Sequence, residues 1–184
     1  MLTDFQKKKL THYFDVLDFD SNGILEEADF LGVAENLCIL RSLEEDARPF
    51  INLTKAYGYQ WSDIYQAVGG DSGQVTLEQW LDHADKHIVN GTDEEFYSFI
   101  SRLTGEIITN FDTDRDGFIS MIEYVDLFVG YNIEVRYIAK SFRLIDRNGD
   151  AYISKEELVE AVEQFFSSDT PDDPGNRLFG FWSE

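Results

Sequence analysis

The sequence predicts an all-α protein made of four helix–loop–helix units arranged in two pairs. Three observations lead to this fold class. Acidic segments that begin at Asp18, Asp112 and Asp146 align with one another without gaps. An apolar stripe of helical period lies before and after each of them. A fourth, weaker copy aligns around Val75, and we expect a short two-residue β-ribbon between the loops of each pair.

The composition indicates a folded, soluble chain with an unusually acidic surface. Of the 184 residues, 43% are hydrophobic and 15% aromatic, which is enough for one substantial core or two small ones. Asp and Glu number 36 against 15 Lys and Arg, so the formal net charge is −21. Such a field repels nucleic acid and anionic membranes and favours cations or basic partners. The alternative is that the carboxylates are solvated and bind nothing. The positions of the acidic residues along the sequence must distinguish these two interpretations.

No feature of the sequence directs the chain to a membrane or to an oxidising compartment. Cys38 is the only cysteine, so no intramolecular disulfide can form. Lys7, Lys8 and Lys9 are not followed by an apolar run, so the N-terminus does not resemble a secretory signal. No stretch approaches the roughly 20 apolar residues that span a bilayer. We therefore expect a cytoplasmic monomer.

The helices on both sides of the three acidic loops are outlined by their apolar stripes. The stripes before the loops are Leu10, Tyr13, Phe14 and Leu17; Phe96, Phe99, Ile100 and Leu103; and Val135, Ile138, Ala139 and Phe142. Those after the loops are Phe30, Leu31, Ala34 and Leu37; Ile122, Val125, Phe128 and Val129; and Leu158, Ala161, Val162 and Phe165. Capping-box spacing predicts helix starts at Thr3, Ser42, Thr92, Ser120 and Ser154. Pro49 indicates a helix start or kink between the first two units.

The loop at 112–123 carries a complete set of oxygen ligands for a hard cation. Ca²⁺ takes about six to eight oxygens, which a short chain supplies by curling around the ion with ligands at positions 1, 3, 5, 7, 9 and 12. Here these positions are Asp112, Asp114, Asp116, the carbonyl of Phe118, Ser120 through a water molecule, and Glu123 as a bidentate ligand. Gly117 stands at position 6, where the sharp turn favours glycine.

The loop at 18–29 has the same pattern with one shorter ligand. Its ligand positions are Asp18, Asp20, Asn22, the carbonyl of Ile24, Glu26 and Asp29, with Gly23 at the turn. Because Asp29 is one methylene shorter than the usual Glu, we expect it to bind through one oxygen, which favours the six-coordinate geometry of Mg²⁺. The sequence therefore predicts a mixed site at which Mg²⁺ competes with Ca²⁺.

The loop at 146–157 has a complete ligand set but an unfavourable turn residue. Its ligand positions are Asp146, Asn148, Asp150, the carbonyl of Tyr152, Ser154 through a water molecule, and Glu157. Ala151 occupies position 6, and a non-glycine residue at positive φ costs on the order of 1 kcal/mol. We expect binding that is weaker than at 112–123, and an empty loop is the alternative.

The second loop, at 68–79, is recovered by placing Val75 at position 8 and Gly73 at position 6. Its ligand positions are Val68, Gly70, Ser72, Thr76 and Gln79, none of them a carboxylate. Such a loop cannot offset the dehydration of Ca²⁺, so we interpret it as the structural partner of the first loop.

His83 and His87 follow the second loop at a spacing of i, i+4, which is able to hold a transition metal. No third ligand is evident from the sequence, so we interpret both as ordinary surface or half-buried histidines.

Together these features resemble the sarcoplasmic calcium-binding protein family of EF-hand proteins, which includes calerythrin and calexcitin. The resemblance rests on four hands, the long connection between the first two, the carboxylate-free second loop, Asp29, and the tail that ends Pro174-Gly-Asn-Arg-Leu-Phe-Gly180. It covers practically the whole chain, and Ala151 is its main departure. The resemblance implies two hand pairs packed as one compact globule, with a role as a Ca²⁺ buffer or, in the calexcitin branch, as a signal transducer.

We expect the chain to divide into three segments along the sequence. Residues 1–90 form the first hand pair, 91–168 the second, and 169–184 a tail. The tail carries Leu178, Phe179, Phe181 and Trp182, so we expect it to fold back over an apolar face. A partner-binding or ligand-capping segment is the alternative.

The side-chain inventory favours a buffer over a sensor. Promiscuous Ca²⁺ sensors open Met-rich grooves, whereas this chain has only Met1 and Met121 and is rich in aromatic residues. A sensor with one dedicated, unknown protein partner is the alternative. We expect no enzymatic activity: photoproteins of similar fold enclose a luciferin with His, Trp and Tyr, and neither of the last two hands here contains a histidine. The sequence leaves open whether the core binds a small apolar molecule. A pocket of suitable size in the structure would decide this.

Overall fold

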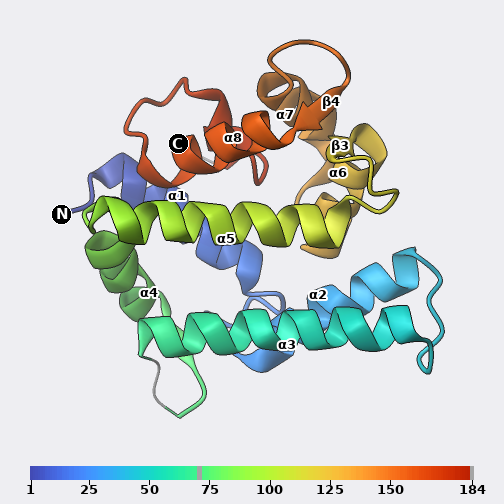
Figure 1. Ribbon diagram of the computed structural model, residues 1–184. Helices are drawn as coiled ribbons and strands as arrows, with labels where there is room; N and C mark the ends of the chain where they lie inside the picture. Colours follow the sequence, from blue (N-terminus) through green and yellow to red (C-terminus); the bar gives the residue numbers. More distant parts are fainter. Residues whose placement is uncertain (70–71, 183–184) are drawn as a thin grey trace.

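The computed structural model describes residues 1–69 and 72–182, and four helix–loop–helix units follow one another along this part of the chain (Figure 1). The first two units comprise α1 (Asp4–Leu17), α2 (Glu27–Leu40), α3 (Arg48–Val68), α4 (Leu77–His83) and a π-helical continuation, η1 (Ala84–Val89). The last two comprise α5 (Asp93–Phe111), α6 (Met121–Gly130), the 3₁₀ turn η2 (Val135–Tyr137), α7 (Ile138–Ile145) and α8 (Lys155–Ser167). The tail contains a further 3₁₀ turn, η3 (Pro174–Arg177).

The loops pair through two small antiparallel ribbons. Strands β1 (Ile24–Leu25) and β2 (Val75–Thr76) join the first two loops, with Leu25 opposite Val75. Strands β3 (Phe118–Ser120) and β4 (Tyr152–Ser154) join the last two, with Ile119 opposite Ile153. The register confirms Val75 as the position-8 residue of the second loop. The second ribbon has three residues per strand, one more than predicted.

Most predicted helix starts are confirmed. Full capping boxes occur at Thr3, Thr92, Ser120 and Ser154, and a further one, which was not predicted, occurs at Thr76. In each of them a side-chain oxygen satisfies a free N–H of the first helical turn.

The predicted helix start at Ser42 is wrong. Helix α3 begins at Arg48, with Pro49 in its first turn as expected. Ser42 instead ends α2: it has a φ of 50°, and the N–H of Leu43 donates to the carbonyl of Cys38 at 2.9 Å. This is a left-handed helix terminus, whereas an N-cap requires extended backbone.

The apolar stripes form the core, with three exposed members, Ile122, Val135 and the small residue Ala139. Ile122 and Val135 are 76% and 56% exposed. Ile122 lies in the first turn of α6, whose buried face is formed by Tyr124, Leu127 and Phe128. Val135 lies in the 3₁₀ turn before α7, where helical periodicity does not yet apply.

The two hand pairs pack against each other through α2 and α6. A Cβ on Gly130 would lie 2.9 Å from Cδ2 of Leu37, so a larger residue at position 130 would displace the Leu37 side chain. Arg41 forms an ion pair with Asp126 at 3.3 Å and donates to the carbonyl of Asn110 at 2.9 Å. The accessible surface of 9657 Å² is close to the roughly 9,100 Å² expected for a compact chain of this mass. The four hands therefore form one globule, as expected.

The tail contributes side chains to this core. Leu178 and Phe179 are 0% and 3% exposed, and the hydroxyl of Tyr124 donates to the carbonyl of Leu178 at 2.7 Å. The ring of Phe179 lies 4.9 Å from that of Tyr13 in α1 and 5.0 Å from that of Phe165 in α8. The tail thus lies against the first helix of hand 1 and the last helix of hand 4.

Lys9 fixes the tail to α1 with a buried cation. Its Nζ donates to the carbonyls of Gln164 and Ser168 at 3.0 and 2.6 Å and to Oδ1 of Asn176 at 2.9 Å. The side chain is 0% exposed. Burial lowers the pKa of Lys9 to about 8, although the carboxylates of Asp173 and Asp169 oppose this shift.

The pKa of Lys9 predicts a pH dependence of stability. Between pH 8 and 10.5 the unfolded chain binds more protons at this amine than the folded chain, so the free energy of unfolding rises with pH in that window. We expect wild type to gain up to about 3 kcal/mol relative to Lys9→Met from pH 7 to 10.5. Urea unfolding of both proteins across this range measures the difference, and a constant difference would contradict the prediction.

Candidate metal centres

The loop at 112–123 brings together the first three of its predicted ligands. Carboxylate oxygens of Asp112, Asp114 and Asp116 all lie within 4.8 Å of one another. The loop backbone orients Asp112, because Oδ1 accepts from the N–H of Asp116 at 3.2 Å and Oδ2 from the N–H of Gly117 at 3.1 Å. Gly117 has a φ of 87°, as its position in the turn predicts.

Glu123 lies at the end of this loop and is not part of the group of three. One of its oxygens accepts from the N–H of Thr113 at 2.7 Å, and the other accepts from the N–H and hydroxyl of Ser120, both at 2.9 Å. Burial opposes ionisation, but these hydrogen bonds together outweigh it and lower the pKa of Glu123. The carboxylate is therefore held ionised beside the loop. Phe118, whose carbonyl oxygen is the predicted ligand at position 7, lies in β3.

The loop at 18–29 gathers positions 1, 3 and 12. Carboxylate oxygens of Asp18, Asp20 and Asp29 lie within 4.8 Å of one another, and Asp18 and Asp29 are only 5% and 2% exposed. Asp29 accepts from the N–H of Phe19 at 3.1 Å and of Glu26 at 2.7 Å. Burial raises the pKa of Asp29, the hydrogen bonds oppose this, and the nearby charges of Asp18 and Asp20 add to the rise. Clustered, buried carboxylates of this kind are stabilised by a bound cation.

The remaining predicted ligands of this loop surround that group. The Asn22 side-chain oxygen accepts from the N–H of Ile24 at 2.9 Å, while its amide nitrogen donates to Asp20 at 3.1 Å. Glu26 accepts weaker bonds, at 3.4 Å, from Asn22 and from Gln74 of the second loop. Ile24 lies in β1.

The loop at 146–157 orients its first ligand in a slightly different way. Asp146 accepts from the N–H of Gly149 at 2.8 Å and of Ala151 at 3.0 Å, that is, from positions 4 and 6. Among the residues described, this loop has no group of three clustered acidic side chains, since Asn148 occupies position 3. Glu157 accepts from the N–H of Arg147 at 3.0 Å. Burial opposes the ionisation of Glu157, but hydrogen bonds, led by that from Ser154, lower its pKa.

The other ligand positions of this loop lie where the sequence places them. Asp150 Oδ1 accepts from the N–H of Tyr152 at 2.9 Å, and Asn148 Oδ1 accepts from the N–H of Asp150 at 2.7 Å. Tyr152 and Ser154 lie in β4.

Positive φ angles occur at two positions of each acidic loop, and sequence reasoning identified only one of them. At position 6, Ala151 has a φ of 71°, which is the strained conformation that the sequence predicts. Position 4 is also left-handed, with φ values of 59°, 62° and 74° at Ser21, Arg115 and Gly149. In the sequence, only Gly149 indicated a left-handed residue at position 4, because glycine readily adopts a positive φ whereas serine and arginine do not.

The strain at position 6 predicts the effect of an exchange of residues between hands. Ala151→Gly is expected to tighten Ca²⁺ binding at 146–157 by up to about tenfold, because the turn no longer costs about 1 kcal/mol. Gly117→Ala is the matched variant, and it should weaken the loop at 112–123 by a similar factor. Calorimetric titration of the metal-free proteins measures both changes, and unchanged affinities would show that the turn is unstrained.

The loop of hand 2 has the same turn but no comparable ligands. Gly73 has a φ of 80° at position 6. The Thr76 hydroxyl donates to Oε1 of Gln79 at 3.1 Å within the capping box of α4. Gly70 lies outside the described residues. None of the other predicted ligand positions carries a carboxylate.

The donor sets of the three acidic loops fit a hard divalent cation. Every predicted ligand atom is an oxygen, as Ca²⁺ and Mg²⁺ require. These loops contain no cysteine or histidine, and Met121 does not stand at a ligand position. In two loops, three carboxylates already lie within 4.8 Å of one another.

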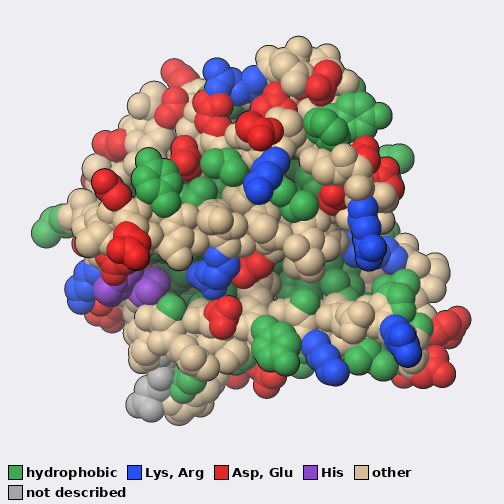
Figure 2. All heavy atoms as spheres, in the orientation of Figure 1, with side chains coloured by type: hydrophobic (Ala, Val, Ile, Leu, Met, Phe, Trp, Pro, Cys, Tyr) green, Lys and Arg blue, Asp and Glu red, His purple; other side chains and the backbone are tan. Residues whose placement is uncertain are grey.

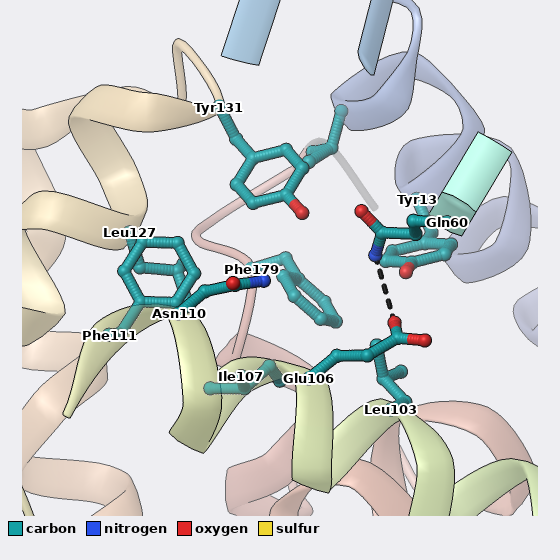
Figure 3. A pocket seen from close by; sticks show the side chains of 11 residues that line it. Tyr13, Gln60, Leu103, Glu106, Ile107, Asn110, Phe111, Leu127, Tyr131 and Phe179 are labelled. Atoms are coloured by element: carbon teal, nitrogen blue, oxygen red, sulfur yellow. Dashed lines mark hydrogen bonds between the residues drawn. The ribbon is translucent and has the colours of Figure 1, made fainter. Parts of the chain in front are cut away.

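Two small cavities lie between the hand pairs, and both are too small for an organic ligand. They have volumes of about 10 and 20 Å³, and both are lined by Tyr13, Gln60 and Glu106. Figure 3 shows the first, with Phe179 and Tyr131 on its wall and Gln60 donating to Glu106 at 2.9 Å. Sites for drug-sized ligands have volumes of about 300–1,000 Å³, whereas these cavities hold about one water molecule each. Two more open grooves between α3 and α5 are larger, with volumes of about 350 and 380 Å³.

Among the described residues, no helix is both long and apolar enough to span a bilayer.

Comparisons with known proteins agree with this arrangement. The family model described as EF hand matches residues 107–129 and 138–162, and the one described as EF-hand domain pair matches residues 1–37. Calerythrin from Saccharopolyspora erythraea is 27% identical over 170 residues, which cover 90% of this chain and 94% of calerythrin.

Two solved structures show the same fold along the whole chain. The coelenterazine-binding protein of Renilla muelleri has a TM-score of 0.78 at 17% identity and covers 97% of this chain and 99% of its own. The sarcoplasmic calcium-binding protein of amphioxus has a TM-score of 0.66 at 17% identity, with 100% of both chains covered. The amphioxus protein is by name a calcium-binding protein, in agreement with the ligand expected for the acidic loops of this chain. The chain is thus a calcium-binding EF-hand protein that is similar to calerythrin over 90% of its length and shares the fold of the sarcoplasmic calcium-binding protein of amphioxus.

Proposed function

We propose that this protein is a cytoplasmic buffer for Ca²⁺ and Mg²⁺ that loads three ions, one in each of the loops at 18–29, 112–123 and 146–157. The ligands are the side-chain and carbonyl oxygens predicted for these loops. The observation that carries the proposal is that ligand carboxylates are already clustered and held by backbone N–H groups. A buffer needs sites that fill without a large rearrangement of the rest of the molecule.

The packing of the core supports a molecule that stays closed when it binds metal. Aromatic rings of different helices contact one another in the core, among them Tyr124 of α6 with Phe142 of α7 at 5.7 Å and Phe99 of α5 with Phe166 of α8 at 4.7 Å. Rigid rings of this kind re-pack less easily than methionine. Residues 1–90 and 91–168 act as the two metal-loading pairs, and the tail at 169–184 holds them together.

Asp29 is expected to make hand 1 the site at which Mg²⁺ competes best. Millimolar Mg²⁺ should lower the apparent Ca²⁺ affinity of this loop more than that of the loop at 112–123. Asp29→Glu should remove the competition, because the longer side chain restores a bidentate ligand. Glu123→Asp is the reciprocal variant and should introduce competition in hand 3. Calorimetric Ca²⁺ titrations with and without Mg²⁺ test this, and equal competition in wild type and both variants would contradict it.

A sensor with one dedicated protein partner is the second candidate. It is favoured by Ile39, at the end of α2, and Ile122, at the start of α6, which are 77% and 76% exposed. Fluorescence of a dye that binds apolar surface distinguishes the two functions. The buffer predicts little change when Ca²⁺ is added, whereas a large increase would reject the buffer in favour of the sensor.

A further inference from the structure

The exiting helix of hand 2 carries a pair of histidines that the calcium-binding function does not use. His83 ends α4, and His87 lies one turn later in the π-helical segment η1. Their ring centres are 5.1 Å apart, with an angle of 30° between the ring planes. Histidine side chains reach the surface beside α4, close to acidic side chains (Figure 2). The side chain of His87 is 51% exposed, so an ion has access to it from solvent.

The spacing of the rings suits a single shared metal ion. Transition metals bind imidazole nitrogen at about 2.0–2.1 Å, so two imidazoles at a tetrahedral angle have ring centres about 5 Å apart. The observed separation of 5.1 Å matches this value without any change of backbone. The π-helical turn lies at this pair, and π-helical turns are frequent at functional sites.

Glu95 holds His87 in the form that binds a metal. Nδ1 of His87 is hydrogen-bonded to Oε1 of Glu95 at 2.8 Å. The other oxygen of Glu95 accepts from the N–H and hydroxyl of Thr92, at 2.8 and 2.9 Å, which fixes the carboxylate. A carboxylate on one ring nitrogen places the proton there and leaves a lone pair on the other, Nε2. Metal-binding histidines usually have such a partner.

The second histidine is neutral, and the surrounding charge favours a cation. Burial lowers the pKa of His83, with smaller contributions from His87 and Arg102, so its imidazole is uncharged at pH 7. Arg102 and Lys86 are positive groups that oppose a cation here. Arg102 lies 3.9 Å from Asp63 and 4.0 Å from Glu106, and Lys86 lies 2.7 Å from Asp82, so carboxylates compensate both charges.

We propose that His83 and His87 bind one divalent transition-metal ion, of which Zn²⁺ is the test case, with water completing its coordination and Glu95 as the positioning residue. Hard cations prefer the oxygen ligands of the loops, whereas imidazole suits Zn²⁺ and Cu²⁺. The structure offers two protein ligands, so the site is open and weaker than a closed structural zinc site. Because the ligand atoms differ, this site fills independently of the three calcium loops.

The test is calorimetric titration of the full-length protein with Zn²⁺ in excess Ca²⁺, which keeps the loops occupied. We expect one Zn²⁺ per chain in wild type, and loss of this binding in His83→Ala and in His87→Ala. Glu95→Gln should weaken it by about 10–100-fold while leaving both ligands in place. Asp82→Asn is the control for general surface charge, since Asp82 lies next to His83 but pairs with Lys86, and it should bind Zn²⁺ nearly as wild type does.

A second measurement locates the ion. The ring of Trp80 lies 6.4 Å from that of His83, so Cu²⁺ at the same site should quench Trp80 fluorescence in wild type and not in the double variant His83→Ala/His87→Ala. Unchanged Ca²⁺ binding by the double variant would show that it is folded. The proposal is overturned if wild type binds no Zn²⁺, or if the double variant binds Zn²⁺ as well as wild type does, since the ion would then be in the loops.

Discussion

Removal of Ca²⁺ is expected to lower the free energy of unfolding by about 8 kcal/mol. A ligand at 100 times its Kd stabilises the folded state by about 2.7 kcal/mol per site, and three independent sites add. For a chain of this length the melting temperature should fall by about 15–30 °C. The formal net charge of −21 acts in the same direction, because the ions neutralise carboxylates that otherwise repel one another. Calorimetric melting in Ca²⁺ and in chelator measures the change.

The contribution of one site can be separated from general screening of charge. Glu123→Gln removes the bidentate ligand of hand 3 and should reduce the stabilisation by Ca²⁺ by about one third. Sodium chloride at equal ionic strength is the control for screening, and it should restore only a small part of the stability. If salt stabilised the metal-free protein as much as Ca²⁺ does, specific binding would not be the cause.

Phe179→Ala is expected to destabilise the protein by about 3–5 kcal/mol although it lies in the tail, outside every loop. Its side chain is 3% exposed and packs between Tyr13 and Phe165, so truncation leaves a cavity between the first and last hands. Urea unfolding in saturating Ca²⁺ measures the effect. Tyr59→Ala is the control, since Tyr59 is 71% exposed and its truncation should change stability by no more than about 0.5 kcal/mol. Similar small effects of both variants would mean that the tail does not stabilise the core.

The loop positions were predictable because metal binding and strand pairing impose a fixed register. Val75 was placed at position 8 from its apolar character alone, and it pairs with Leu25 in the structure. Ala151 was expected to adopt a positive φ from its position in the loop, and it does so. These features depend on neighbours within twelve residues, so one chain segment contains the information.

Features that depend on distant parts of the chain were missed. Lys9 belongs to a run of three lysines that suggests solvent exposure, yet its acceptors are Gln164, Ser168 and Asn176, about 155 or more residues away. The sequence offered one indication that Lys9 is buried: it directly precedes Leu10, the first residue of the apolar stripe of α1. Ser42 has the spacing of a capping box, but the pattern cannot distinguish a residue that begins one helix from a residue that ends another.

The hydrogen-bond partner of His87 was also beyond the sequence. Glu95 lies in the first turn of the next helix and is itself half of the Thr92 capping box. Only the fold brings its carboxylate to within 2.8 Å of His87.

Equilibrium binding of Ca²⁺ to the chelator-treated protein at physiological salt tests the central claim most directly. Three ions per chain are expected, falling to two when Asp112 is replaced by Asn, because the loop then loses the charged ligand at position 1, which is Asp in all three acidic loops. Uptake of no calcium by the wild-type protein would contradict the assignment of all three loops.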